Sequence, residues 1–263
     1  MLKPWLRLFR IVNLPTVPGD VFVGAAAAMC WCGRASATSQ DYAAITLAAA
    51  SSCFLYLFGL VDNDIAGAET DKGRPIPDGE ISMYAARRAR DLCFLLGLFS
   101  VTAICLLHSS FAELVSVSCG FMLLLLACAI CTYNRTKSSA MMGVCRGLNV
   151  VLGVTAVAPP LMWPRLVARA PLQACVVAAV AVVWVAYIAA VTKYSEGEEA
   201  DPERRRMVGQ LLGGIVYLQI SVLAALSLFF PSVTATRRLL VACAAMLVAL
   251  RVLKFAFPRV SAS

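Results

Sequence analysis

The sequence predicts an all-α transmembrane bundle of about eight helices, and three observations support this fold class. Hydrophobic residues make up 60% of the chain and charged residues only 14%, whereas soluble domains carry about 25% charged residues. Apolar stretches approaching the length of a membrane helix, about 20 residues, recur along the 263 residues. Lys and Arg alternate between the loops as an even number of spans requires. We therefore expect a single transmembrane domain over residues 1–263.

Eight apolar stretches are candidate membrane spans. We expect them at residues 17–31, 42–61, 92–107 (with a start as early as Met83), 111–132, 141–159, 172–191, 208–230 and 239–257. Residues 1–16 form a basic, amphipathic N-terminal segment without the cleavage pattern of a secretory signal. Residues 62–82 and 192–207 remain as two polar loops between spans.

Lys and Arg are distributed unevenly between the two ends of this bundle. Eighteen of the 23 fall on the side that holds both termini and the 62–82 and 192–207 loops. Because loops rich in Lys and Arg stay in the cytoplasm, we expect both termini and both loops there, in a plasma or inner membrane. The net charge of +8 is then topological, and no basic soluble module points to nucleic acid.

The 11 cysteines and the lone histidine indicate neither a redox site nor a zinc site. Nearly all the cysteines lie in apolar stretches, where thiols act as small apolar residues. Cys128 and Cys131 form a CxxC pair, but on an expected membrane helix. His108 falls on the non-cytoplasmic side, away from the acidic loops, and is not expected to act as a base.

Eleven of the 15 acidic residues cluster in the 62–82 and 192–207 loops. Acidic residues contribute little to topology, so the clustering predicts a polar site at one membrane face. Ordinary solvated loop composition is the alternative. If the second span continued as a helix through residue 71, Asn63, Gly67 and Asp71 would share one face, with Asp64 adjacent. Oxygen ligands so placed suit Mg²⁺ together with substrate phosphates, and Arg74 supplies a fork for phosphate oxygens.

A second polar cluster lies around the start of the fifth span. Lys137 is a candidate point charge for a phosphate, and Arg146 and Asn149 lie three residues apart on the same expected helix. Ionisable residues on membrane helices usually face the protein interior and mark function. The alternatives are an Arg146 side chain that reaches to the interface and an Asn149 amide that bonds a neighbouring helix.

Taken together, these motifs resemble the UbiA prenyltransferase superfamily over essentially the whole chain. Asn63-Asp64, Asp71 and the segment Arg74-Pro75-Ile76-Pro77-Asp78-Gly79 are similar to its NDxxDxxxD motif followed by RPxPSG. The segment from Arg10 to Thr16 resembles its opening segment, and Tyr133 to Lys137 its Tyr-and-Lys loop. Residues 143–153 look most like the EboC branch, which carries MGxCRxLNxLLG there.

The resemblance implies a Mg²⁺-dependent transferase that moves an isoprenyl group from a prenyl diphosphate to an acceptor that the sequence does not identify. By matched position, the metal site would comprise Asn63, Asp64, Asp71, Glu198 and Asp201, the first four of them catalytic. The substrate diphosphate site would comprise Arg74, Lys137, Arg146 and Asn149.

The chain departs from the superfamily pattern in three ways. Gly67 stands where the motif has its middle Asp, the second acidic motif from Thr192 to Asp201 is not a clean DxxxD, and we count eight spans where the superfamily has nine. Either the ninth helix is absent or the first spans are miscounted, and the alternation of charge favours absence. An isoprenoid-binding or transport protein with a degenerate metal site is therefore the alternative function. An unrelated transporter would predict internal repeats, and none is evident.

Overall fold

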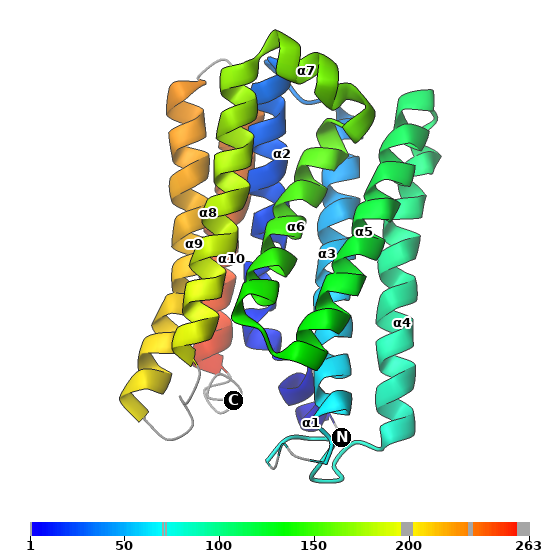
Figure 1. The fold of residues 1–263 in the computed structure, drawn as a ribbon, viewed down its shortest axis with the longest axis vertical. Helices are drawn as coiled ribbons and strands as arrows, with labels where there is room; N and C mark the ends of the chain where they lie inside the picture. Colours follow the sequence, from blue (N-terminus) through cyan, green and yellow to red (C-terminus); the bar gives the residue numbers. More distant parts are fainter. Residues whose placement is uncertain (1, 70, 72, 196–201, 231–233, 257–263) are drawn as a thin grey trace.

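The chain folds into a bundle of long helices (Figure 1), in a computed structural model that describes residues 2–69, 71, 73–195, 202–230 and 234–256. Across that part of the chain, eight helices have 15 residues or more. They are α2 (Pro18–Cys32), α3 (Ser39–Ala66), α4 (Met83–Thr102), α5 (Ser110–Thr136), α6 (Ser139–Val157), α8 (Pro171–Ser195), α9 (Pro202–Phe229) and α10 (Thr234–Ala256). Each falls on one of the eight expected spans, which confirms the predicted fold class.

Seven stretches of the described chain are long and apolar enough to cross a membrane, and they take in α2 to α6, α8 and α9. Helix α10 has 23 residues, but it carries Arg237 and Arg238 near its start and Arg251 and Lys254 near its end. The charged ends leave an apolar middle between them. The protein is thus an integral membrane protein.

Shorter helices complete the bundle and revise the expected loops. The N-terminal segment forms α1 (Leu2–Leu8) and the 3₁₀ helix η1 (Ile11–Thr16); the others are η2 (Ala103–Leu107), η3 (Pro160–Met162) and α7 (Trp163–Arg169). The 62–82 loop begins later than expected because α3 runs through Ala66. In the 192–207 loop, α8 reaches Ser195 and α9 starts at Pro202, so only residues 196–201, outside the described part, remain between them.

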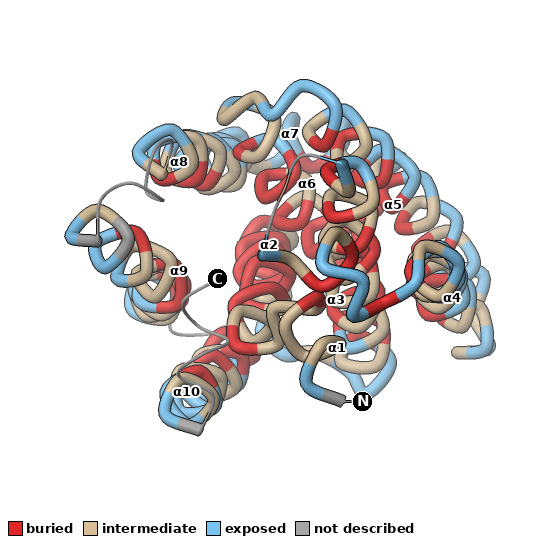
Figure 2. Tube along the Cα trace, turned by 90° about the horizontal axis from the view of Figure 1, so that it is seen from below, coloured by how far each residue is buried: buried red, intermediate tan, exposed pale blue. Residues whose placement is uncertain are grey.

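Helix α2 lies at the centre of the bundle and is buried along most of its length (Figure 2). Its contact with α6 depends on glycine. A Cβ added at Gly24 would lie 1.9 Å from the Val150 carbonyl oxygen, and one at Gly153 would lie 2.0 Å from that of Val21. Small residues let membrane helices approach this closely, so α2 and α6 touch backbone to backbone.

The N-terminal helix fixes the segment that follows α3. Leu8 packs with Val61, Ile76 and Ile81 in a small apolar cluster. Arg7 Nη1 lies 2.9 Å from Glu80 Oε1, and its Nη2 donates to the Gly73 carbonyl at 2.8 Å. Figure 1 shows α1 and this segment at the same end of the bundle as the α5–α6 turn. Residue 74 is therefore held at that end.

The opposite end of α3 is fixed by a reciprocal capping box, in which the Thr38 hydroxyl accepts from the Asp41 N–H and the Asp41 carboxylate accepts from the Thr38 N–H. Arg34 Nη2 also donates to Asp41 Oδ2 at 2.8 Å. This Arg–Asp pair is far from the 67–82 segment, at the other end of a 28-residue helix.

Candidate functional site

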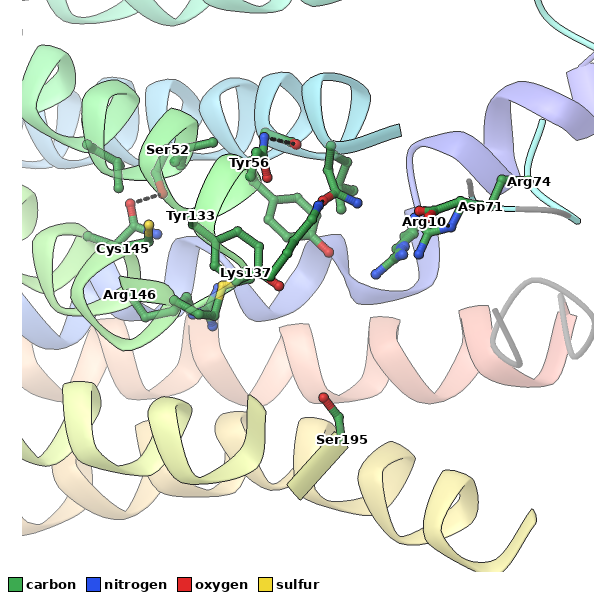
Figure 3. Close-up of a pocket in the computed structure, with 18 residues that line it drawn as sticks. Arg10, Ser52, Tyr56, Asp71, Arg74, Tyr133, Lys137, Cys145, Arg146 and Ser195 are labelled. Atoms are coloured by element: carbon green, nitrogen blue, oxygen red, sulfur yellow. Dashed lines mark hydrogen bonds and ion pairs between the residues drawn. The ribbon is translucent and has the colours of Figure 1, made fainter. Parts of the chain in front are cut away.

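A cavity of about 330 Å³ opens between α3, α5 and α6 at the end of the bundle where α3 terminates (Figure 3). Ligand pockets of small molecules usually have volumes of about 300–1,000 Å³. Helix α3 contributes Ser52, Tyr56, Gly59 and Asn63, whose spacing of three to four residues defines one helix face, and Leu60 beside Gly59. The cavity therefore follows α3 from its polar end into the bundle.

The other two walls follow the same periodicity. Helix α5 contributes Leu126, Ile130, Tyr133 and Asn134, and helix α6 contributes Met142, Cys145, Arg146 and Asn149. In Figure 3, Arg10, Asp71 and Arg74 lie at one end of the cavity, Ser52, Cys145 and Arg146 lie toward the other, and Tyr56, Tyr133 and Lys137 lie between them. The cavity has one end lined by Arg10, Asp71 and Arg74, and further in its lining combines apolar and aromatic groups with the polar side chains of Ser52, Arg146 and Asn149.

Basic side chains outnumber carboxylates in the described lining of the cavity. Among the residues that the structure describes, its lining holds four basic side chains, those of Arg10, Arg74, Lys137 and Arg146, against the single carboxylate of Asp71. A concave site lined by one sign of charge concentrates ligands of the opposite sign. The geometry therefore suits a polyanion such as a diphosphate.

Arg74 joins the two aspartates of the first motif. Its Nη1 donates to Asp64 Oδ1 at 2.6 Å, and its Nε lies 3.4 Å from Asp71 Oδ2. Asp64 is buried and reaches the cavity wall through this contact. The carboxylates of Asp64 and Asp71 are thus brought together around one guanidinium.

The condition that a helix continues to residue 71 is not met. Helix α3 ends at Ala66, and Gly67 caps it with a φ of −92°. Asp71 is instead brought back by a turn in which its N–H donates to the Gly67 carbonyl at 2.9 Å. A Cβ at Gly67 would lie 2.5 Å from Asp71 Oδ2. The missing side chain at position 67 therefore makes room for the Asp71 carboxylate.

Lys137 is placed by the tight turn between α5 and α6. It caps α5 in the left-handed region, with a φ of 52°, and its N–H donates to the Tyr133 carbonyl. Its ammonium donates to Asn63 Oδ1. Burial lowers the pKa of Lys137 below its usual 10.5, an effect that Asp71 opposes. Two other non-glycine residues of the described chain have a positive φ: Arg10, which also lines the cavity, and His108, which does not.

Arg146 and Asn149 line the cavity from α6 and are both buried. The Asn149 amide oxygen accepts a hydrogen bond from the Ser52 hydroxyl at 2.8 Å, which links α6 to α3. Arg146 Nε lies 2.9 Å from Asp20 Oδ2, and its Nη2 donates to the Thr16 carbonyl at 3.0 Å. Arg146 therefore turns inward to a buried carboxylate and does not extend to the membrane interface.

Most of the residues singled out in the sequence come together here. Asn63, Asp71, Arg74, Lys137, Arg146 and Asn149 line the cavity, and Asp64 is attached to it through Arg74. Glu198 and Asp201 lie outside the described residues. Sequence reasoning did not assign Arg10, Ser52, Tyr56, Tyr133 or Asn134 to the site. The signal for Ser52 and Tyr56 was available, because they lie eleven and seven residues before Asn63 on the same helix face.

The oxygen ligands available at the cavity meet part of the coordination that Mg²⁺ requires. Within the described residues no group of three or more His, Cys, Asp or Glu side chains forms a metal cluster. Asp64, Asp71 and Asn63 supply two carboxylates and an amide oxygen, each of which now contacts a cation at the cavity. Mg²⁺ commonly uses one or two carboxylates with substrate phosphates as the remaining ligands. These three residues would hold the ion, provided a diphosphate completes its coordination.

The fold is similar to that of solved UbiA homologs from Archaeoglobus fulgidus. The form bound to GPP and Mg²⁺ aligns with a TM-score of 0.52 and 17% identity over 95% of this chain and 87% of that one. The form bound to DMAPP and Mg²⁺ aligns with a TM-score of 0.51, 17% identity and coverage of 95% and 86%. The form bound to Cd²⁺ aligns with a TM-score of 0.50, 18% identity and coverage of 97% and 89%.

The comparison of folds identifies the class of this protein as a membrane helix bundle with the UbiA-like fold. No family model matches the sequence, and no curated protein matches it. The similarity to solved structures therefore shows the fold, and the residues that line the cavity indicate the chemistry.

Proposed function

We propose that this protein is a Mg²⁺-dependent membrane prenyltransferase built as one UbiA-like domain over residues 1–263. The observation that carries the proposal is the cavity, which four basic side chains line along its length, and where Arg74 joins Asp64 and Asp71 at the charged end of a partly apolar interior. A prenyl diphosphate has the same division into a polyanionic head and an apolar tail. The UbiA homologs of similar fold bind GPP and DMAPP.

The diphosphate head would lie among the basic side chains at the cavity. Arg74 offers a planar fork for phosphate oxygens and Lys137 a compact point charge. Asn63, Asp64 and Asp71 would hold Mg²⁺, and Glu198 and Asp201 are proposed as further ligands. The ion would neutralise charge on the departing diphosphate. Arg10 and Arg146 add fixed positive charge where negative charge develops, which is the usual basis of electrostatic catalysis.

The isoprenyl tail would extend along the apolar lining, which includes Leu60, Leu126 and Ile130. The allylic carbon–oxygen bond breaks, and the diphosphate leaves with the bonding electron pair. The acceptor attacks the allylic carbon and loses a proton. Tyr56 and Tyr133 line the same cavity, and aromatic faces attract cations, so their rings would stabilise the allylic cation.

Two finer assignments belong to the proposal. The sequence from Gly143 to Gly153 supports a place near the EboC-like branch, since Cys145, Arg146 and Asn149 follow that pattern. The excess of Lys and Arg at the end that holds the cavity supports a site at the cytoplasmic face, with both termini on that side.

The experiment is a diphosphate-release assay on the purified full chain with geranyl diphosphate, Mg²⁺ and a panel of acceptors. Release that depends on Mg²⁺ and is lost in Asp71→Asn supports the transferase. The departure at Gly67 favours a second candidate, an isoprenoid-binding protein without catalysis. It predicts that prenyl diphosphate binds but that no diphosphate is released with any acceptor.

A further inference from the structure

A buried carboxylate joins four helices beside the cavity. Asp20 on α2 is 0% exposed. Its Oδ1 accepts hydrogen bonds from Trp184 Nε1 on α8 at 2.8 Å and from Gln219 Nε2 on α9 at 2.7 Å. Its Oδ2 forms the ion pair with Arg146 on α6. The carboxylate therefore has partners from three neighbouring helices.

The chain leaves space for this arrangement. A Cβ added at Gly19 would lie 2.1 Å from Gln219 Oε1, so the glycine beside Asp20 lets the amide approach. Gln219 Nε2 also donates to the Thr16 carbonyl at 2.8 Å. Gln219 and Arg146 thus both donate hydrogen bonds to the Thr16 carbonyl and to the Asp20 carboxylate.

Stability alone is a weak reason for a buried ion pair. Two charges taken out of water cost several kcal/mol each, and apolar residues of the same volume are often as stable or more so. Charged residues in membrane spans are rare and usually functional. The pair between Asp20 and Arg146 is therefore better explained by the cavity that Arg146 lines.

We propose that Asp20 is a positioning residue that holds the Arg146 guanidinium at the cavity wall, oriented for an anionic ligand. The inference rests on the proposed diphosphate site. Arg146 is held on two sides, by the Asp20 carboxylate and by the Thr16 carbonyl. Arg74 and Lys137, in contrast, contact Asp64, Asp71 and Asn63, the candidate metal ligands. When a diphosphate binds, they would give up these contacts for contacts with its phosphate oxygens. A cation fixed before the ligand arrives loses less entropy on binding and needs no reorganisation in the reaction.

The test is equilibrium binding of inorganic diphosphate, with Mg²⁺ present, to the purified full chain. Asp20→Asn keeps an oxygen acceptor for Trp184 and Gln219 and removes the ion pair. We expect its affinity to fall about tenfold. Arg146→Gln should lose about as much. The double variant should bind no more weakly than Arg146→Gln alone, because both changes remove one interaction.

Asp41→Asn is the matched control. Asp41 is also a buried carboxylate paired with an arginine, but it lies at the opposite end of α3. The Asp41→Asn variant should have a lower melting temperature and an unchanged affinity for diphosphate. If Asp20→Asn does not fold, Trp184→Phe takes its place. It deletes one bond that fixes the Asp20 carboxylate, and we expect an affinity loss of about threefold.

Failure of the inference can be told apart from failure of the proposed function. If the wild-type chain does not bind diphosphate, both are wrong. If the wild type binds and the folded Asp20→Asn variant, or its replacement Trp184→Phe, binds equally well, Asp20 does not position Arg146. Tighter binding by Asp20→Asn would also overturn the inference, because it is the result expected if Asp20 merely neutralises a cation.

Discussion

Replacing Arg74 with Gln should have opposite effects on the two ligands of the proposed site. Arg74 Nη1 lies 2.6 Å from Asp64 Oδ1, and Nε lies 3.4 Å from Asp71 Oδ2. The guanidinium therefore competes with Mg²⁺ for both carboxylates, while it is itself a diphosphate ligand. Arg74→Gln should strengthen binding of Mg²⁺ alone and weaken binding of inorganic diphosphate.

The size of both effects follows from the contacts that are lost. A hydrogen bond to a charged group contributes about 1.5–3 kcal/mol. The Arg74 side chain is 28% exposed, so we take the lower end of that range, because solvent screens exposed pairs. At about 1.4 kcal/mol per factor of ten, each affinity should change about tenfold. Isothermal titration calorimetry of the detergent-solubilised chain measures both.

Arg34→Gln is the control for this prediction. The Arg34–Asp41 pair has a distance of 2.8 Å and side-chain exposures of 31% and 7%, close to the 28% and 7% of Arg74 and Asp64. Arg34→Gln should therefore lose similar stability without changing either affinity. Unchanged Mg²⁺ affinity in Arg74→Gln, or equal changes in both variants, would refute the reasoning.

Three further predictions test the site and its support. Gly67→Ala places a Cβ 2.5 Å from Asp71 Oδ2; it should reduce Mg²⁺-dependent diphosphate binding several-fold by calorimetry, with little change in melting temperature. Because burial lowers the pKa of Lys137 and only its charged form binds anions, diphosphate affinity should fall as pH rises through that lowered pKa, and Lys137→Arg should flatten this profile. Gly153→Ala, with a Cβ 2.0 Å from the Val21 carbonyl oxygen, should cost about 1–3 kcal/mol or more, read as a lower melting temperature.

Each of these predictions has a result that contradicts it. Gly120→Ala is the control for both glycine variants, since a Cβ there meets nothing within 4 Å. If Gly120→Ala lowers diphosphate affinity as much as Gly67→Ala, or the melting temperature as much as Gly153→Ala, the close Cβ contacts do not cause these losses. A wild-type affinity that stays constant up to about pH 10, near the pKa of an ordinary lysine, would exclude the assigned role of the Lys137 ammonium.

The sequence was sufficient to predict the long helices and six of the residues that line the cavity. Apolar length located all eight long helices, because a membrane span has few alternatives to a helix. The spacing paired Arg146 with Asn149 on one expected helix, and both line the cavity from α6, whereas Asn63 was expected in the 62–82 loop and lies in the last turn of α3. Where helices were too short in the prediction, as at Ala66 and Ser195, polar residues continued the helix beyond the apolar stretch.

The remaining features depend on contacts between distant parts of the chain. Asp20 was visible only as a charge near the start of the first span, and its hydrogen-bond partner Trp184 lies 164 residues away. Arg10 reaches the cavity through a left-handed residue conformation that no pattern signals. The meeting of Asp64 and Asp71 at Arg74 depends on the turn after Gly67, whereas the shared face proposed for Asn63, Gly67 and Asp71 was conditional on a continuous helix.

Equilibrium binding of geranyl diphosphate to the purified chain, with and without Mg²⁺, tests the central claim most directly. The wild type should bind much more tightly with Mg²⁺, and the Asp64→Asn/Asp71→Asn double variant should lose that dependence while it remains folded. Two results would contradict the account: a folded wild-type chain that does not bind the ligand, or binding that is the same with and without Mg²⁺ in both proteins.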